Sequence, residues 1–201
     1  MLYLASFSIY PRCFGSTTSP APVLAVPSET MTDQQQALVS LLNQLQIVHT
    51  HFSHAAVFTT ADVAKLTEDI PGSDTKNLFL RDEKRSRYIL VCVRAETRVN
   101  LKELGKQLGI KGLCFATPDE LQSLLGVTPG SVCLFALMND VDGRVTGFLD
   151  SSITPTEAIQ NHPLENTATI VLTAADIARF CAHAGHPLTR IEIPARIAAA
   201  S

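Results

Sequence analysis

Three short segments of this chain carry the residue types that could hydrolyse an activated bond. The pair Lys76-Asn77 runs directly into the apolar residues 78–80, the loop 126–130 reads Gly-Val-Thr-Pro-Gly, and His162 stands just before an alternating apolar stretch. A lysine amine holds a phosphate or carbonyl oxygen as a compact charge. Glycines let backbone N–H groups approach an oxyanion. These types favour positioning and charge stabilisation as the chemistry of the site.

Signatures of other hydrolytic and nucleotide-dependent chemistries are missing. The sequence contains no GxSxG elbow, no GxxxxGK[ST] loop, no GxGxxG fingerprint and no HExxH motif. No local signature places a serine or cysteine nucleophile beside a base. We therefore expect no cofactor.

The cluster His49-Thr50-His51-Phe52-Ser53-His54 raises the question of a metal. In a strand, His49 and His51 would share one face and could provide two ligands. The sequence offers no evident third ligand, so we expect hydrogen-bonded or surface histidines and no metal. A metal hydrolase built on these histidines is kept as a weaker alternative.

Composition favours a folded hydrolase domain over a nucleic-acid-coating protein. The 201 residues are 46% hydrophobic and 17% charged, with a formal net charge of −3 and a pI near 6.0. Extensive phosphate contact requires a basic protein, so any nucleic acid should be met locally, by a few lysines and arginines near a pocket. No apolar run reaches the roughly 18 residues of a membrane span, which predicts no membrane association.

The chain divides into three parts. Residues 1–30 are rich in Ser, Thr, Pro and Ala, residues 31–196 carry regular periodicity, and residues 197–201 form a short tail. Residues 1–30 fit either an organellar transit segment or an extension upstream of a start at Met31. Cys92, Cys114 and Cys133 lie in apolar runs, which predicts buried, reduced thiols and a reducing compartment. We expect a cytoplasmic protein, or a mitochondrial or plastid one if residues 1–30 are a transit segment.

Residues 31–196 alternate between helix and strand patterns, which predicts an α/β (α+β) domain with a central mixed, largely antiparallel sheet surrounded by helices. Hairpins are expected between 77–80 and 88–93, and between 132–138 and 144–149. Further strands are expected at 47–54, 112–115 (buried) and 165–172. Helices are expected from Thr32, from Thr60 to Pro71, over 101–108, from Pro118, and from Ala174 to Gly185.

The motifs together resemble the family of freestanding prolyl-tRNA deacylases, relatives of the editing domain inserted in bacterial prolyl-tRNA synthetases. The resemblance covers residues 33 to 194, with matching pieces in the family's order. These pieces are His54 with 57–59, then 76–82, 125–132, 135–140 and 162–169.

The resemblance implies hydrolysis of alanine mistakenly esterified to proline tRNA. It places Lys76 and Asn77 at the site for the amino acid and terminal adenosine, and His162 in the aminoacyl pocket. It gives the loop residues Gly126, Thr128, Pro129 and Gly130 the role of holding the substrate, with Asn166 as a further binding residue. We expect Lys76, His162 and Gly130 to be catalytic, mischarged tRNA to be the partner, and prolyl-tRNA synthetase to be an associated protein.

Two other readings stay open from the sequence. A relative could clear cysteine or another small amino acid from tRNA. A binding module could hold aminoacyl-tRNA in the same pocket without cleaving it. A deacylation assay separates these readings.

Overall fold

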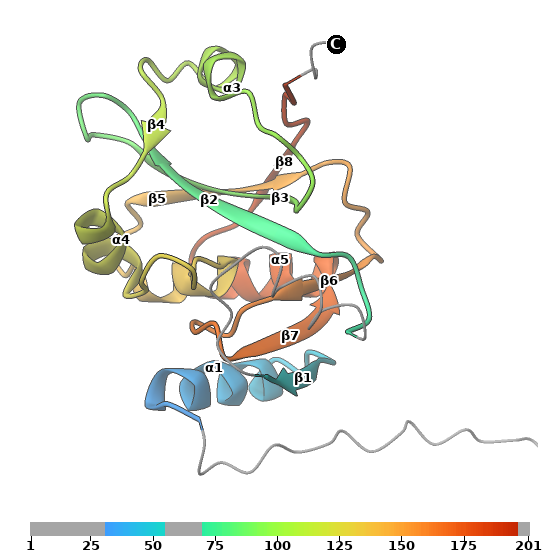
Figure 1. The fold of residues 1–201 in the computed structure, drawn as a ribbon. Coiled ribbons are helices and arrows are strands. Elements are labelled where there is room, and N and C mark those ends of the chain that lie inside the picture. The colour runs from blue at the N-terminus through green and yellow to red at the C-terminus, as the bar shows by residue number, and fades with distance from the viewer. Residues whose placement is uncertain (1–30, 55–69, 197–201) are drawn as a thin grey trace, which may run out of the picture.

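The computed structural model describes residues 31–54 and 70–196 (Figure 1). The described helices are α1 (Asp33–Gln44), α3 (Leu101–Gln107), α4 (Pro118–Leu125), α5 (Ala174–His183) and the 3-10 helix η2 (Leu134–Asn139). None of the helices in these two ranges is long and apolar enough to cross a membrane. The extension 1–30, the helix expected from Thr60 and the tail 197–201 lie outside the described residues.

A five-stranded mixed sheet forms the centre of the molecule, in the order β4-β2-β3-β5-β8. Its strands are β2 (Thr75–Arg81), β3 (Tyr88–Arg94), β4 (Cys114–Phe115), β5 (Val145–Asp150) and β8 (Thr189–Ile191). Strand β2 pairs antiparallel with β3 and β4, whereas β5 pairs parallel with β3 and β8. The predicted mixed α/β domain is confirmed.

A second sheet has three antiparallel strands in the order β1-β7-β6. These are β1 (Thr50–Ser53), β6 (Ala158–Asn161) and β7 (Ala168–Thr173). The two sheets touch where the chain enters β2, through an isolated bridge between Ser73 and Ile159. The sequence patterns predicted β1 and β7, but they predicted neither β6 nor this division into two sheets.

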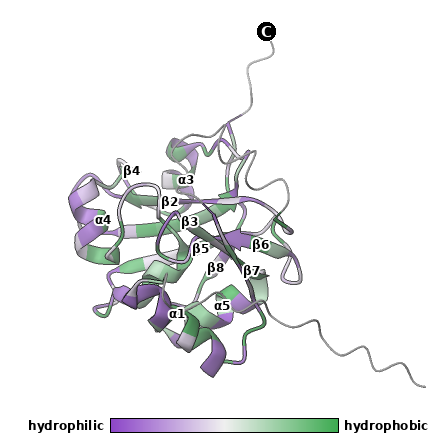
Figure 2. Cartoon of the chain, turned by 60° about the horizontal axis from the view of Figure 1, so that its bottom comes forward, coloured by the Kyte–Doolittle hydropathy of each residue, from purple (hydrophilic) through white to green (hydrophobic). Residues whose placement is uncertain are grey.

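The central sheet is covered on both faces, and its strand β3 is therefore buried along almost its whole length. Leu90 and Cys92 pack on one side with α1, α4 and α5, while Ile89 and Val91 pack on the other side with α3. Figure 1 shows α3 above this sheet and α5 with η2 below it, between the two sheets. In Figure 2, hydrophilic and hydrophobic residues alternate along α1 and α5, as expected for helices with one buried face.

The helix starts follow the local signals closely. Thr32 and Gln35 form a capping box at α1, and Thr117 and Glu120 form one at α4, with Pro118 in the first turn. In α4 the Thr117 N–H donates to Glu120 Oε2 at 2.7 Å. These caps confirm the predicted helix starts at α1 and α4.

The predicted hairpin between 132–138 and 144–149 is wrong. Residues 134–139 form η2, and β5 pairs with β3 and β8 instead. Leu134 and Phe135 are both fully buried, so this run shows no alternation between a core face and a solvent face. A short continuous apolar run cannot be assigned to strand or helix from periodicity.

The expected burial of the strand at 112–115 is also wrong. The observed strand β4 contains only Cys114, which is half-buried, and Phe115, which is 59% exposed. Cys92 and Cys133 are buried free thiols as predicted, and burial raises the pKa of Cys133 to about 11. Such thiols are inert at neutral pH.

Candidate active site

A small cavity lies where the two sheets meet, at the start of β2. Its volume is about 200 Å³, which is small compared with pockets for drug-sized ligands. Strand β2 and the residue before it form one wall, β6 and β7 form the facing wall, and the loop after α4 closes one side. The lining residues are Asp74, Thr75, Lys76, Asn77, Gly130, Val132, Gln160, Asn161, His162 and Thr169.

The β2 wall carries the positive charge of the site. Lys76 is half-buried and opposite Val93 in the β2–β3 ladder, and its Nζ donates to the Ala95 carbonyl at 2.6 Å. That bond uses one of the three ammonium donors and leaves two for a ligand. The neighbouring Asn77 has a buried Oδ1 with no hydrogen-bond partner in the protein. An unpaired buried amide oxygen is costly, which is typical of a position that a ligand donor completes.

The facing wall is neutral and more deeply buried. His162 Nδ1 lies 3.3 Å from the Ala168 carbonyl, and burial lowers the pKa of His162, so the ring is uncharged at pH 7. Asn161 is 3% exposed, and its Oδ1 lacks a partner in the protein. Thr169 Oγ1 lies 3.0 Å from Nε2 of His54, the residue that follows β1.

Asp74 provides the one carboxylate among the lining residues. Burial raises its pKa, and the nearby His162 ring and the Thr75 backbone N–H act in the opposite direction. Asp74 precedes β2, and its carbonyl accepts a hydrogen bond from the Ala95 N–H at 3.1 Å. An acidic side chain, Asp74, and a basic one, Lys76, therefore line the cavity two residues apart at the start of β2.

The loop after α4 is shaped by two glycines in the left-handed region. Gly126, with φ of 65°, ends α4, and a Cβ there would lie 3.1 Å from Asn139 Nδ2. Gly130 has φ of 95° and lines the cavity. The Ser131 N–H donates to the Thr128 carbonyl at 3.0 Å, which closes the turn between them. Side chains other than glycine are strained at both φ values.

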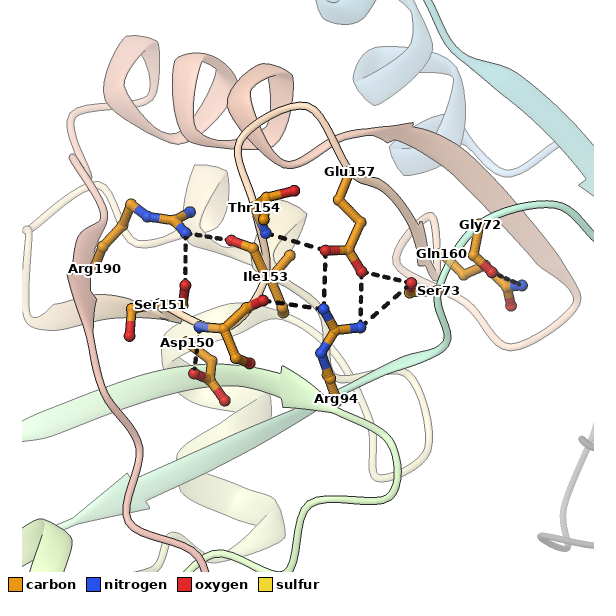
Figure 3. A network of polar contacts seen from close by, with 11 residues as sticks. Gly72, Ser73, Arg94, Asp150, Ser151, Ile153, Thr154, Glu157, Gln160 and Arg190 are labelled. Atoms are coloured by element: carbon orange, nitrogen blue, oxygen red, sulfur yellow. Dashed lines mark hydrogen bonds and ion pairs between the residues drawn. The ribbon is translucent and has the colours of Figure 1, made fainter.

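An ion-pair network fastens the two walls together next to the cavity (Figure 3). Arg94 at the end of β3 contacts both carboxylate oxygens of Glu157, at 2.7 and 2.9 Å. The Ser73 hydroxyl donates to the same carboxylate at 2.6 Å, and the Thr154 N–H donates at 3.0 Å. These bonds lower the pKa of Glu157 to about 2. The network therefore holds the chain entering β2 against the chain entering β6.

Backbone and amide contacts continue this junction into the cavity. The Ser73 N–H donates to the Ala158 carbonyl and the Gln160 N–H to the Ser73 carbonyl, at 2.9 and 3.0 Å. The Gln160 side chain donates to the Ile70 carbonyl. It also donates to the Gly72 carbonyl (Figure 3). Thr75 Oγ1 donates to the Gln160 carbonyl at 2.7 Å. The separation of the two walls is thus set by short polar contacts.

The structure brings four of the eight predicted site residues into one cavity: Lys76, Asn77, Gly130 and His162. Pro129 lines an adjoining hollow together with Asn77 and Gly130. Asn166 is half-buried, with its Nδ2 4.0 Å from the place of a Cβ on Gly130. Gly126 and Thr128 are not among the residues that line the cavity.

Sequence reasoning did not single out several lining residues: Asp74, Thr75, Gln160, Asn161 and Thr169. Asp74 and Thr75 adjoin the Lys76 motif, and Asn161 adjoins His162, so proximity to a motif was the available signal. Thr169 lies at the end of the last matching segment. Gln160 lies in β6, which the sequence patterns did not predict, and it carries no local signal.

The histidines near β1 differ in their contacts. His49 Nδ1 lies 2.9 Å from the Ile47 carbonyl. Both ring nitrogens of His51 are buried without a hydrogen-bond partner in the protein, and burial lowers the pKa of His51. Within residues 31–54 and 70–196, no three His, Cys, Asp or Glu side chains are grouped so that they could share a metal ion.

The cavity is lined mainly by charged, amide and imidazole side chains. Its two hydroxyls, on Thr75 and Thr169, are both hydrogen-bonded. That composition suits a hydrolase acting on a bond that is already activated, where a held water and a stabilised oxyanion are sufficient. Residues 54–180 match the model of the aminoacyl-tRNA editing domain, and the chain belongs to that family. The enzyme class expected from the sequence, an aminoacyl-tRNA deacylase, is confirmed.

Sequence relatives agree with this assignment. The chain is 33% identical over 163 residues to the prolyl-tRNA editing protein ProX of Acetoanaerobium sticklandii, covering 80% of this chain and 98% of the relative. It is 37% identical over 156 residues to the prolyl-tRNA synthetase associated domain-containing protein 1 of Danio rerio, covering 77% and 84%.

A solved structure shares the fold. A protein described as a candidate trans-editing enzyme for prolyl tRNA synthetase aligns with a TM-score of 0.60 at 18% identity, covering 82% of this chain and 98% of that chain. At this identity the likeness concerns the fold alone.

Proposed function

We propose that this protein edits in trans, by hydrolysing the ester of alanine wrongly attached to proline tRNA. The observation that carries the proposal is the convergence of Lys76, Asn77, Gly130 and His162 on one cavity of about 200 Å³. The relative named as a prolyl-tRNA editing protein supports proline tRNA as the carrier. Prolyl-tRNA synthetase is the expected partner, because it produces the mischarged substrate.

In the proposed reaction, the ester carbonyl lies near Lys76 and the glycine turn at Gly130. The Lys76 ammonium, anchored on the Ala95 carbonyl, keeps two donors for developing negative charge or for a phosphate of the terminal nucleotide. A water attacks the carbonyl carbon, the ester C–O bond breaks, and the ribose oxygen leaves with a proton. These steps involve no covalent intermediate between the substrate and the protein.

The neighbouring ribose hydroxyl is the proposed proton carrier. Nδ1 of His162, one of the lining residues, contacts a backbone carbonyl. If the substrate's own hydroxyl transfers the proton, the protein does not need to supply a paired base and nucleophile. Replacing that hydroxyl on the terminal adenosine by hydrogen should stop turnover while binding persists. Unchanged turnover of the deoxy substrate would remove this step.

Discrimination between alanine and proline is proposed to rest on size. The β6–β7 wall is buried and is hydrogen-bonded to β2 through Thr75 and Gln160. Widening the cavity to take the larger proline ring would therefore disrupt packed, hydrogen-bonded structure. Excluding a larger residue in this way is easier than rejecting a smaller one, for which a methylene is worth only about 1–3 kcal/mol. Cysteine, close to alanine in size, is the alternative substrate.

The deciding experiment is deacylation of a panel of charged tRNAs by the purified protein. The panel contains alanyl, cysteinyl and prolyl forms of proline tRNA, and alanyl-tRNA for alanine. We expect rapid loss of alanine from proline tRNA and little loss of proline. Preference for the cysteinyl form would replace the amino-acid assignment, and binding without hydrolysis of any form would refute the enzyme assignment.

A further inference from the structure

One aromatic side chain beside the active site faces solvent without an evident structural reason. Phe115 is 59% exposed, although it belongs to β4, where the sequence pattern predicted burial. Its backbone is firmly held, since Phe115 pairs with Leu80 of β2 and the Ala116 N–H donates to the Phe79 carbonyl at 3.0 Å. A rigid backbone thus presents a large apolar ring to water.

Phe115 lines two hollows that flank the catalytic cavity. The first, of about 170 Å³, also contains Lys76 together with Arg98 and Arg196. The second, of about 210 Å³, contains Asn77, Pro129 and Gly130. The remaining lining of the second hollow is mostly apolar: Phe79, Ala116, Pro118, Leu121 and Val132. Each hollow therefore shares residues with the cavity, and Phe115 belongs to both.

The contrast between the hollows matches the parts of a nucleotide. The first hollow carries three cations, Lys76, Arg98 and Arg196, beside the apolar side chains of Leu78, Val99 and Leu101, and the cations suit a phosphate. The second hollow is mostly apolar and carries no charged side chain, which suits a flat base. An ester held in the cavity between Lys76 and Asn77 places the ribose at the junction of the two. The base and the phosphate on that ribose then extend in different directions.

We propose that Phe115 is a stacking platform for the nucleobase at the 3′ end of the tRNA. The terminal base lies on the Phe115 ring over the apolar hollow, and its phosphate lies toward Arg98 and Arg196. This inference rests on the proposed tRNA substrate and adds the residue that holds the base. Because every base has a π face, the contact anchors the end of any tRNA and leaves the choice among tRNAs to other contacts.

Tryptophan fluorescence provides a direct test, because the chain contains no tryptophan. In Phe115→Trp the single indole reports on this position alone. The probe is an uncharged RNA hairpin with the unpaired CCA end of a tRNA, and its matched control lacks only the terminal base. We expect saturable quenching by the complete hairpin, with affinity lower by about 5- to 140-fold for the abasic hairpin. Equal quenching by both RNAs would overturn the inference.

Steady-state kinetics give a second test with matched variants. Phe115→Ala should raise the KM for mischarged tRNA by about 5- to 140-fold with kcat nearly unchanged, and Phe115→Tyr, which keeps the π face, should restore it. Val141→Ala removes a 90% exposed apolar side chain elsewhere and should change neither constant. An unchanged KM in Phe115→Ala would refute the inference.

The two proposals fail in different ways. If wild-type protein hydrolyses mischarged tRNA but Phe115→Ala retains a normal KM, only the stacking role is lost. If wild-type protein hydrolyses no mischarged tRNA, the proposed function is lost, and the hairpin titration still decides whether a base sits on residue 115. The 59% exposure of Phe115 means that its replacement should leave thermal unfolding unchanged, which a melting curve checks.

Discussion

The two walls of the cavity differ in charge, burial and origin. The β2 wall belongs to the five-stranded sheet, is half-buried, and presents the Lys76 ammonium beside Asp74. The β6–β7 wall belongs to the three-stranded sheet and presents Asn161 and Thr169, each 3% exposed, with an uncharged His162. In the proposed function, the five-stranded sheet brings the charge that acts on the ester, and the three-stranded sheet brings a buried neutral surface that sets which amino acid fits.

Because the two walls differ in this way, substitutions on each wall should have different effects on activity. A change on the β2 wall should reduce the rate for every substrate, because it removes charge stabilisation of the transition state. A change on the β6–β7 wall should alter selectivity more than rate. A change at the junction of Arg94 with Glu157 should act first on stability.

Lys76→Ala should have the largest effect. Loss of a charged donor at a developing oxyanion typically reduces kcat by about 100- to 1,000-fold, so deacylation of alanyl-tRNA should become barely measurable. Single-turnover deacylation with the enzyme in excess measures this loss. Lys84→Ala, which removes an exposed lysine from the turn after β2, is the matched control and should keep normal activity. Wild-type activity in Lys76→Ala would refute the role of the β2 wall.

His162→Ala should mainly change selectivity. Removing the half-buried ring opens space on the neutral wall, so prolyl-tRNA should become a better substrate relative to alanyl-tRNA by about 10- to 100-fold. The ratio of kcat/KM values for the two esters is the measurement. An equal fall for both esters would show that His162 acts on the rate, and the two walls would then share one role.

Glu157→Ala should lower the free energy of unfolding by about 1–2 kcal/mol. The carboxylate accepts hydrogen bonds from Arg94, Ser73 and the Thr154 N–H, but water partly screens the ion pair. Urea unfolding followed by circular dichroism measures the change. Arg190→Ala tests a neighbouring cation that bonds only backbone carbonyls and should cost less.

The Glu157 carboxylate should also make the free energy of unfolding fall at acidic pH. The pKa of Glu157 is about 2 in the folded protein and about 4.3 in an unfolded chain. Its contribution is therefore complete above pH 4.3 and disappears as the pH falls toward 2. Wild-type protein should lose stability more steeply than Glu157→Ala over this range. Parallel pH profiles for the two proteins would show that the network does not join the walls.

Thr169→Val should have the smallest effect. The substitution keeps the shape of the neutral wall and removes only the hydroxyl bonded to His54, so kcat should fall by less than about tenfold. A loss as large as that of Lys76→Ala would indicate that Thr169 is itself a nucleophile with His54 as its base. Trapping of an acylated protein by acid quench would then be expected.

Features that depend on neighbouring residues were predictable from the sequence. The caps Thr32, Thr117 and Thr173 and the β2–β3 hairpin follow local signals, because a cap or a tight turn is made within a few residues. The helix η2 and the exposure of Phe115 were not predictable, because both depend on which elements pack against them. The ion pair of Arg94 with Glu157 joins residues 63 positions apart, and no local pattern marks it.

The sequence by itself determined the α/β class, the capped helices and the three motifs that carry Lys76, Gly130 and His162. Only the tertiary structure decided that β2 and β6 belong to different sheets and meet at Ser73, which creates the cavity between them. It also decided which flanking residues line that cavity, Asn161 and Thr169 among them. The physical reason is range: caps and turns are satisfied within one segment, whereas a cavity exists only where segments distant in the chain pack side by side.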